Sequence, residues 1–287
     1  MISQLRCGVS GWSHPEWTGT LYSKHKAKTH HPLTMLAQSF DSIEIDQTFE
    51  GPVREEASRL WLSKVTNNPR FMFTAGLWKK FTHDRQLDPT DIDAFKKGLW
   101  PLFNARKLGC LVMQFPWSFR YTAENREFFI QLRRAFHEFP LVAEMRHASW
   151  MMEEAVGTMI DYRVGFVNID QPEHIKAMPP TSFLTSAIGY VRLHGRDHHN
   201  WLNDFGKDAN AVQPAEYFYS REELAAWKLR IDRVNQHAAA SFVVFTNNLG
   251  ANSVYNALTM ETMVEGVERP AVARVITRQP ELFRAVA

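Results

Sequence analysis

Eight short apolar runs, spaced along the whole chain, constrain its fold more than any other feature of the sequence. Each run is rich in β-branched or aromatic residues, and its length suits a strand covered on both faces. The runs are Leu5–Ser10, Ser42–Asp46, Phe71–Ala75, Leu108–Phe115, Leu141–Arg146, Val164–Asp170, Ile188–His194 and Phe242–Asn247. The sequence therefore predicts eight buried β-strands.

Segments with helical periodicity separate these runs. Pro52–Val65 opens on proline, Glu124–Phe136 repeats large apolar residues at helical spacing, and Arg221–His237 has an acidic first turn. Eight units in 287 residues give about 36 residues per unit, which is typical of a (β/α)8 barrel. An open doubly wound sheet is the alternative, but no GxGxxG motif follows the first run. We expect an α/β fold, a single TIM-barrel-like domain spanning residues 1–287.

Two segments do not fit the repeating pattern. Residues 195–220 form a long connection after the seventh run, and loops of this length are commonly functional. Residues 270–287 are expected to pack as a closing segment over the barrel.

Charge and cysteine content bound the class of protein. The chain has 33 Lys and Arg against 31 Asp and Glu, a formal charge of +2, which excludes a polybasic nucleic-acid coat. Cys7 and Cys110 lie singly inside two of the runs, as expected of free thiols in a reducing compartment. No stretch approaches the roughly 18 apolar residues of a membrane span. We expect a soluble, cytoplasmic protein that binds no membrane, in an oligomeric state that the sequence leaves open.

Polar side chains gather at the carboxyl ends of the predicted strands. They are Glu44 with Asp46, Glu144 with Arg146, Asn168 with Asp170, Arg192 with His194, and the single residues Gln114 and Asn247. Residues two apart on a strand share a face, and the carboxyl-terminal end of a barrel carries its chemistry. The pattern predicts an active site at this end. The alternative is a buried polar network that only plugs the barrel.

The charges of these strand ends do not balance. Four carboxylates (Glu44, Asp46, Glu144 and Asp170) face two arginines, Arg146 and Arg192. Buried like charges require compensation. Three explanations stay open: one carboxyl is a protonated general acid, a divalent cation binds, or outlying cations such as Arg196 and Lys79 fold in.

Roles follow from the residue types. We predict Glu44, Glu144, His194 and Asp170 as catalytic residues. We predict Arg146, Arg192, Arg196, Asp46, Gln114, Asn247 and Trp12 as substrate-binding residues. The two arginines of the strand ends are also expected to pair with Glu44 and Glu144. His147 is predicted to be structural, capping the helix near Ser149, and the pair His198-His199 to lie in a solvated loop. No HExxH motif is present, so we assign no metal ligand. We assign no cofactor, with a bound divalent metal as the alternative.

The tryptophans are unevenly distributed. Trp61, Trp100 and Trp227 fall in predicted helices, whereas Trp12, Trp17, Trp78, Trp117, Trp150 and Trp201 follow predicted strands. Aromatic walls at that end would stack a sugar or nucleobase. We expect most of the six to form a second hydrophobic layer instead, with one or two facing the site.

Several stretches along the chain match the motifs of one known family. They are Gly8–Ser13 with Trp17, Glu44–Phe49, Thr82-His83, Gln114–Pro116, Glu144–Trp150, Arg192–Arg196, and Phe245–Asn248 followed by Asn256-Ala257. On these residues the chain resembles the DUF72, or YecE-like, family. These stretches span nearly the whole chain. The resemblance implies a TIM-barrel-like fold and no defined reaction.

Six positions depart from the pattern that this resemblance leads us to expect. They are Asp46, Gln47, Glu50, Gly51, Gly76 and Leu249, where Asn, Ser, Tyr, Arg, Lys and His are usual. The departures predict a divergent subgroup, with a changed preference for substrate charge or with lost chemistry.

Our functional prediction is an enzyme that acts on a polar small molecule or a nucleotide-like compound. Carboxylates and His194 would carry hydrolase, lyase or isomerase chemistry. One alternative is a non-catalytic ligand-binding protein, and another is a metal-dependent phosphoesterase or nuclease. A small-molecule ligand is the expected partner, and the near-neutral charge disfavours broad nucleic-acid binding.

Overall fold

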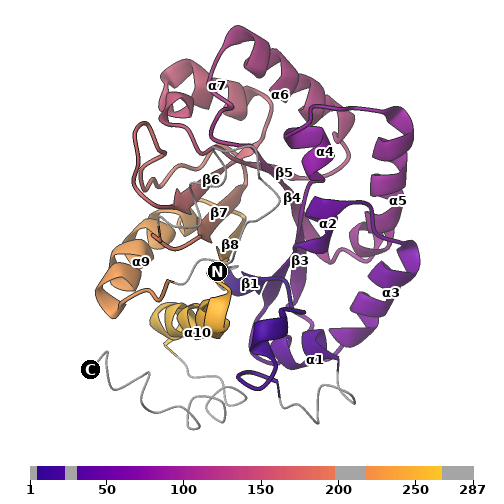
Figure 1. Ribbon diagram of the computed structural model, residues 1–287, viewed down its shortest axis with the longest axis vertical. Coiled ribbons are helices and arrows are strands. Elements are labelled where there is room, and N and C mark those ends of the chain that lie inside the picture. Colours follow the sequence, from indigo (N-terminus) through magenta and orange to yellow (C-terminus); the bar gives the residue numbers. More distant parts are fainter. Residues whose placement is uncertain (1–4, 23–30, 198–216, 267–287) are drawn as a thin grey trace.

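Eight parallel strands pair in sequence order and close into a barrel, with helices around the outside (Figure 1). The structure, a computed structural model, describes residues 5–22, 31–197 and 217–266. The strands are β1 (Leu5–Ser10), β2 (Ser42–Ile45), β3 (Met72–Gly76), β4 (Leu108–Gln114), β5 (Leu141–Glu144), β6 (Gly165–Asp170), β7 (Ile188–Leu193) and β8 (Ala240–Phe245). All eight predicted strands are confirmed, with ends shifted by one or two residues.

The outer layer contains the three helices expected from periodicity. These are α3 (Glu55–Lys64), α6 (Ala123–Ala135) and α9 (Arg221–Asn235). The remaining helices are α1 (Pro32–Leu36), α2 (Gln47–Glu50), α4 (Lys79–Thr82), α5 (Pro89–Asn104), α7 (Glu153–Asp161) and α10 (Asn252–Glu265), with short 3₁₀ turns η1 (Pro15–Trp17), η3 (Ala148–Met151) and η5 (Leu249–Ala251). Residues 198–216 and 267–287, which include His198, His199, Trp201 and the predicted closing segment, lie outside the described residues.

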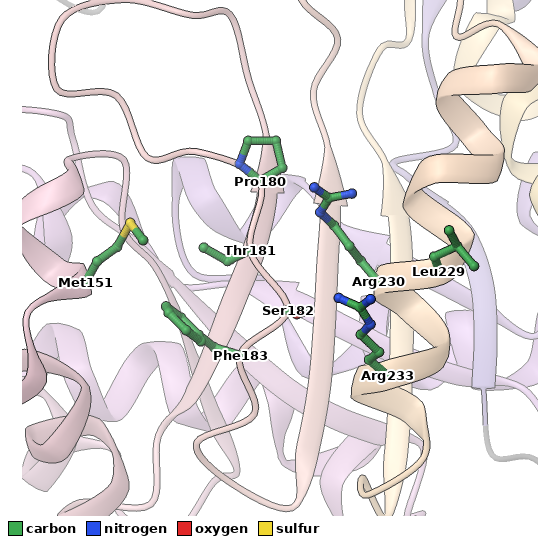
Figure 2. Close-up of a pocket in the computed structure, with 8 residues that line it drawn as sticks. All are labelled: Met151, Pro180, Thr181, Ser182, Phe183, Leu229, Arg230 and Arg233. Atoms are coloured by element: carbon green, nitrogen blue, oxygen red, sulfur yellow. The ribbon is translucent and has the colours of Figure 1, made fainter.

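The sixth unit departs from the regular pattern. No helix is found among residues 171–187, which connect β6 to β7 and are all described. Prolines at positions 172, 179 and 180 remove amide donors and disfavour a helix there. Instead, Asn168 accepts hydrogen bonds from the Thr181 hydroxyl and the Phe183 amide, both at 2.7 Å. A groove of about 440 Å³ lies between this segment and α9 (Figure 2).

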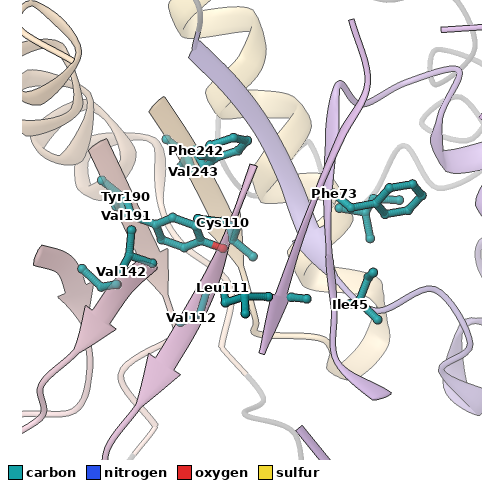
Figure 3. Close-up of a cluster of buried hydrophobic side chains, with 14 of the residues drawn as sticks. Ile45, Phe73, Cys110, Leu111, Val112, Val142, Tyr190, Val191, Phe242 and Val243 are labelled. Carbon is teal, nitrogen blue, oxygen red and sulfur yellow. The ribbon is translucent and has the colours of Figure 1, made fainter. Parts of the chain in front are cut away.

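Strand register decides which side chains fill the barrel. Directly paired residues of parallel strands point to the same side, and Val167 pairs with Tyr190 while Ile169 pairs with Arg192. Below the polar strand ends, the barrel interior is apolar and includes Val112, Val142 and Phe242, and Tyr190 lies at the level of Phe242, with which it pairs (Figure 3). Burial of these side chains stabilises the closed barrel by about 1.5–3 kcal/mol each. The polar strand ends therefore stand on a packed apolar base.

The described residues contain no helix with the length and apolar character needed to cross a bilayer.

Two helical glycines provide a matched test of how the outer layer packs. A Cβ atom on Gly98 of α5 would lie 2.1 Å from the Val53 carbonyl oxygen, whereas a Cβ atom on Gly157 of α7 would meet nothing within 4 Å. We expect Gly98→Ala to lower the free energy of unfolding by about 1–3 kcal/mol. Gly157→Ala should raise it by about 0.5–1 kcal/mol, because alanine is the better helix former. Urea denaturation measures both, and a loss at both positions would contradict this packing.

Candidate active site

A network of buried charged side chains occupies the carboxyl-terminal end of the barrel interior. Glu44 comes from β2, Glu144 from β5, Arg192 from β7, and Arg146 and His194 follow their strands directly. Glu144 has no solvent exposure, and the other four are at most 7% exposed. The strand alternation that predicted these five residues at one end is confirmed in their geometry.

Arg192 joins the two carboxylates. Its Nη2 donates to Glu44 Oε1 at 2.9 Å, and its Nη1 donates both to Glu144 Oε2 and, at 2.8 Å, to Gln114 Oε1. Arg146 Nε donates to Glu144 Oε1 at 2.9 Å. The arginines therefore pair with the glutamates as expected: Arg192 bonds to both carboxylates, and Arg146 bonds to Glu144. Charge-assisted bonds of this kind are the strong class of hydrogen bond.

Two hydroxyl groups donate hydrogen bonds to the Glu44 carboxylate in addition to Arg192. The Tyr190 hydroxyl donates to Glu44 Oε2 at 2.8 Å, and the Ser10 hydroxyl donates to Oε1 at 3.2 Å. Thr74 in turn lies 2.8 Å from the Tyr190 hydroxyl. The sequence prediction missed Ser10, Thr74 and Tyr190. Tyr190 lies two residues before Arg192 on the same strand, so strand alternation was the signal that would have found it.

His194 is held at both ring nitrogens. Nε2 lies 3.1 Å from Glu144 Oε2, and Nδ1 lies 2.8 Å from Thr246 Oγ1. An ionised carboxylate only accepts hydrogen bonds, so the proton of neutral His194 belongs on Nε2 and Nδ1 is the basic nitrogen. Thr246, which the sequence prediction also missed, is 3.3 Å from the Leu193 carbonyl oxygen. The Thr246 hydroxyl can therefore donate either to His194 Nδ1 or to the Leu193 carbonyl oxygen.

The pKa values of the network follow from burial and from the paired charges. Burial alone would raise the pKa of Glu144, but Arg192, His194 and Arg146 outweigh it and hold that pKa well below its ordinary value. Burial lowers the pKa of His194, although Glu144 opposes this effect. Ionised Glu144 beside neutral His194 is the state that both shifts favour at neutral pH.

Asp170 and Arg196 lie on the other side of the barrel wall. The expectation that Asp170 shares the interior with Glu44 is wrong, because Ile169 pairs with Arg192 and the next residue on the strand points the opposite way. Asp170 instead accepts from Arg196 Nε at 3.0 Å, and Arg196 also donates to Glu223. Asn168 shares this outer side.

The apparent excess of negative charge disappears with this placement. Asp46 is 40% exposed and lies 3.9 Å from His14 Nε2, and Asp170 pairs with Arg196. Only Glu44 and Glu144 remain inside, and Arg146 and Arg192 balance them. Of the three explanations for the charge imbalance, the structure shows pairing with an outlying cation, because Arg196 binds Asp170. Lys79, the other cation considered, pairs with Glu50 at 2.5 Å. Among the described residues, no three His, Cys, Asp or Glu side chains are grouped to hold a metal ion.

The other predicted contacts are mostly structural. Asn247 is fully buried and donates to the Tyr217 carbonyl and to Asn256, at 2.7 and 3.0 Å. Trp12 is 2% exposed and packs edge-on against Trp61, with ring centroids 5.2 Å apart. Gln114, by contrast, belongs to the buried charged network, because it accepts a hydrogen bond from Arg192. Trp17 and Trp150 are fully buried, as expected for a second hydrophobic layer.

Acidification is expected to weaken the fold through Glu144. A carboxyl with a depressed folded pKa contributes its stability above its ordinary pKa of 4.5 and loses it as the pH falls through the folded pKa. The slope of unfolding free energy against pH should reach about 1.4 kcal/mol per unit for this group. Urea denaturation at pH values below 4.5 should show a steeper slope for the wild type than for Glu144→Gln, which cannot ionise. Equal slopes would mean that folding does not lower the pKa of Glu144, and would contradict this account.

Comparison with known proteins covers almost the whole chain. The model of the family "Protein of unknown function DUF72" matches residues 6–280. The UPF0759 protein YunF of Bacillus subtilis (strain 168) is 25% identical over 289 residues, covering 96% of this chain and 99% of that protein. A DUF72 family protein from Thermotoga maritima MSB8 is 25% identical, with a TM-score of 0.76 over 91% of this chain and 99% of that one. A second, from Enterococcus faecalis V583, is 23% identical, with a TM-score of 0.77 over 91% and 95%; this likeness shows the fold.

Proposed function

The chain belongs to the DUF72 family of proteins of unknown function, and we propose that it is an enzyme that moves a proton on a polar small molecule at the carboxyl-terminal end of its barrel. His194 is the proton-transfer group, and the observation that carries the proposal is its position between Glu144 and Thr246. Hydrolysis, elimination and isomerisation all use such a group.

Glu144 acts as a positioning residue for His194. Its carboxylate fixes the imidazole orientation and stabilises the imidazolium that forms on proton uptake, as carboxylate partners of histidine do in other enzymes. Its depressed pKa makes Glu144 itself a weak base. This observation shifts the acid–base role away from Glu144 and onto the histidine.

Thr246 gives the proton a defined route to the basic nitrogen. In the neutral state the Thr246 hydroxyl donates to His194 Nδ1. When the Thr246 hydroxyl passes its proton to Nδ1 and its Oγ1 accepts a proton from the substrate, protonated Nδ1 donates to Oγ1 and the re-formed hydroxyl donates to the Leu193 carbonyl oxygen. Every polar hydrogen keeps an acceptor through the transfer, so no donor is left unsatisfied when the histidine becomes protonated.

A ligand-binding protein without catalysis is the second candidate. Its support is that protein donors already engage both oxygens of Glu44 and both oxygens of Glu144. A network this complete would orient Arg146 and Gln114 toward a ligand without performing chemistry. The departures at Glu50 and Gly76 favour this candidate too, since Glu50 pairs with Lys79 and Gly76 leaves the β3 end without a side chain.

A metabolite-extract experiment distinguishes the two candidates. Wild-type protein and His194→Gln are incubated with the same extract, and both the solution and the protein-bound fraction are analysed by mass spectrometry. An enzyme should consume a compound that His194→Gln leaves intact. A compound that is retained by both proteins and consumed by neither would contradict the catalytic proposal.

A further inference from the structure

A basic and aromatic cluster lies on the rim of the barrel, beside the network described above. It consists of Trp117 and Arg120 after β4, His147 after β5, and His174 and Lys176 in the connection after β6. The Trp117 ring lies 5.2 Å from that of His147 and 5.7 Å from that of His174. The Arg120 guanidinium stands 5.3 Å over the Trp117 ring. We call these five residues the rim cluster.

The backbone fixes this cluster to the candidate active site. The Met178 amide and the Gln171 side chain both donate to the Arg146 carbonyl, at 2.9 and 3.1 Å. The Ala148 amide donates to the Lys176 carbonyl at 2.9 Å. Arg146 also donates to Glu144, and His147 is the next residue along the chain. A ligand that reached the rim cluster would therefore lie at the same end of the barrel as His194.

His147 directs a donor into this cluster. The prediction that it caps the turn at Ser149 is confirmed, because the Ser149 amide donates to His147 Nδ1 at 3.1 Å. With Nδ1 accepting, the proton of the neutral ring is on Nε2. His147 is 4% exposed, and its Nε2 is buried without a hydrogen-bond partner among the described residues. An unsatisfied buried donor costs about 1–3 kcal/mol, so this position calls for an acceptor.

The charges around His147 have one sign. Burial lowers the pKa of His147, and Arg120, Lys176 and His174 lower it further. In the part of the chain that the structure describes, neither Arg120 nor Lys176 forms a salt bridge with a carboxylate. Arg120, Lys176 and the Nε2–H group of His147 therefore offer hydrogen-bond donors and positive charge but no acceptor.

We propose that the rim cluster binds a phosphoryl group of the substrate. A phosphate carries up to two negative charges and several acceptor oxygens, so one group would meet the guanidinium, the ammonium and the His147 donor together. The substrate would thus be a phosphate ester of a polar small molecule, with its reacting part over His194. This inference rests on the proposed function for the place of reaction, but the binding itself does not require catalysis.

Inorganic phosphate tests the site directly. Binding is followed by tryptophan fluorescence at constant ionic strength, because salt screens surface charges, and Trp117→Phe identifies the part of the signal that comes from the cluster. We expect saturable binding that Arg120→Gln/Lys176→Gln weakens at least about tenfold. His147→Asn, which keeps an acceptor for the Ser149 amide but lacks the distal donor, should also weaken binding.

The controls separate this site from general charge effects. Lys228→Gln/Arg230→Gln removes the same charge from α9, and it should leave the phosphate affinity unchanged. Equal weakening by both double variants, equal binding of acetate, or no saturable phosphate binding would overturn the proposal. Phosphate binding with no turnover of any extract compound would instead count against the proposed enzyme and leave the rim cluster supported.

Discussion

Replacing Arg192 with methionine is expected to lower the free energy of unfolding by about 3–5 kcal/mol, because it leaves the buried Glu44 carboxylate without a cationic partner among the described residues and removes one of the two arginines that bond to Glu144. Arg192 bonds to both Glu44 and Glu144, and both glutamates are at most 2% exposed. Methionine is unbranched and fills the space of the aliphatic part of arginine, which limits the loss of packing. The measurement is urea denaturation at pH 7.

Two other variants make this result interpretable. Arg230→Met removes a guanidinium whose only hydrogen bond within the described chain is to the Ala226 carbonyl, and it should change stability by about 0.5 kcal/mol or less. Arg192→Lys keeps the charge but loses the fork of donors, so we expect a smaller loss of about 1.5–3 kcal/mol. If Arg192→Met is too unstable to purify, Arg192→Lys against Arg230→Met remains a complete test. Equal stability of those two would contradict the bridging role of Arg192.

Replacing His194 with glutamine is expected to reduce kcat/KM by about 10²–10⁴, the range that general acid–base groups contribute. Glutamine retains one donor toward Glu144 and one acceptor toward Thr246, so the two neighbours of the histidine keep their partners. It cannot take up a proton. Steady-state kinetics on a compound consumed by the wild type measures the effect, and the midpoint of thermal unfolding shows that the variant is folded.

Thr246→Val is the matched control for the proton route. Valine has nearly the shape of threonine but removes the hydroxyl that joins His194 Nδ1 to the Leu193 carbonyl. Activity should fall less than in His194→Gln, and the fall should come with a changed pH dependence. A His194→Gln enzyme that retained activity within about tenfold of the wild type would contradict the role of the histidine.

The barrel was predictable from sequence because its signals are local. Buried strands of a parallel barrel read as continuous apolar runs, and Ser220, which caps α9 together with Glu223, is visible as a helix start. The missing sixth helix was not predicted, although the prolines at 172, 179 and 180 were available as a signal. Eight regular runs suggested eight complete units, and the extended segment held by Asn168 was overlooked.

The site was predictable only in part. Whether a strand side chain points into or out of the barrel depends on how that strand pairs with its neighbour. Glu44, Glu144, Arg192 and His194 were placed together correctly by alternation within their strands. Asp170 was placed wrongly, since alternation shows that it shares a side with Asn168 but not which side that is. Pairing of Ile169 with Arg192 decides the question, and pairing register is a property of two strands. Thr246 was missed because a lone threonine after a strand carries no sequence signal.

The central claim is that His194 is a neutral base beside an ionised Glu144, and side-chain nitrogen NMR tests it most directly. Histidine ¹⁵N signals are recorded as the pH is lowered from 8, and His194 is assigned by comparison with His194→Gln. We predict that His194 is neutral at pH 7, carries its proton on Nε2, and titrates with a pKa below its ordinary value of 6.5. An imidazolium that persists from pH 7 to pH 8 would contradict the account, because a histidine already protonated has no site at which to accept a proton.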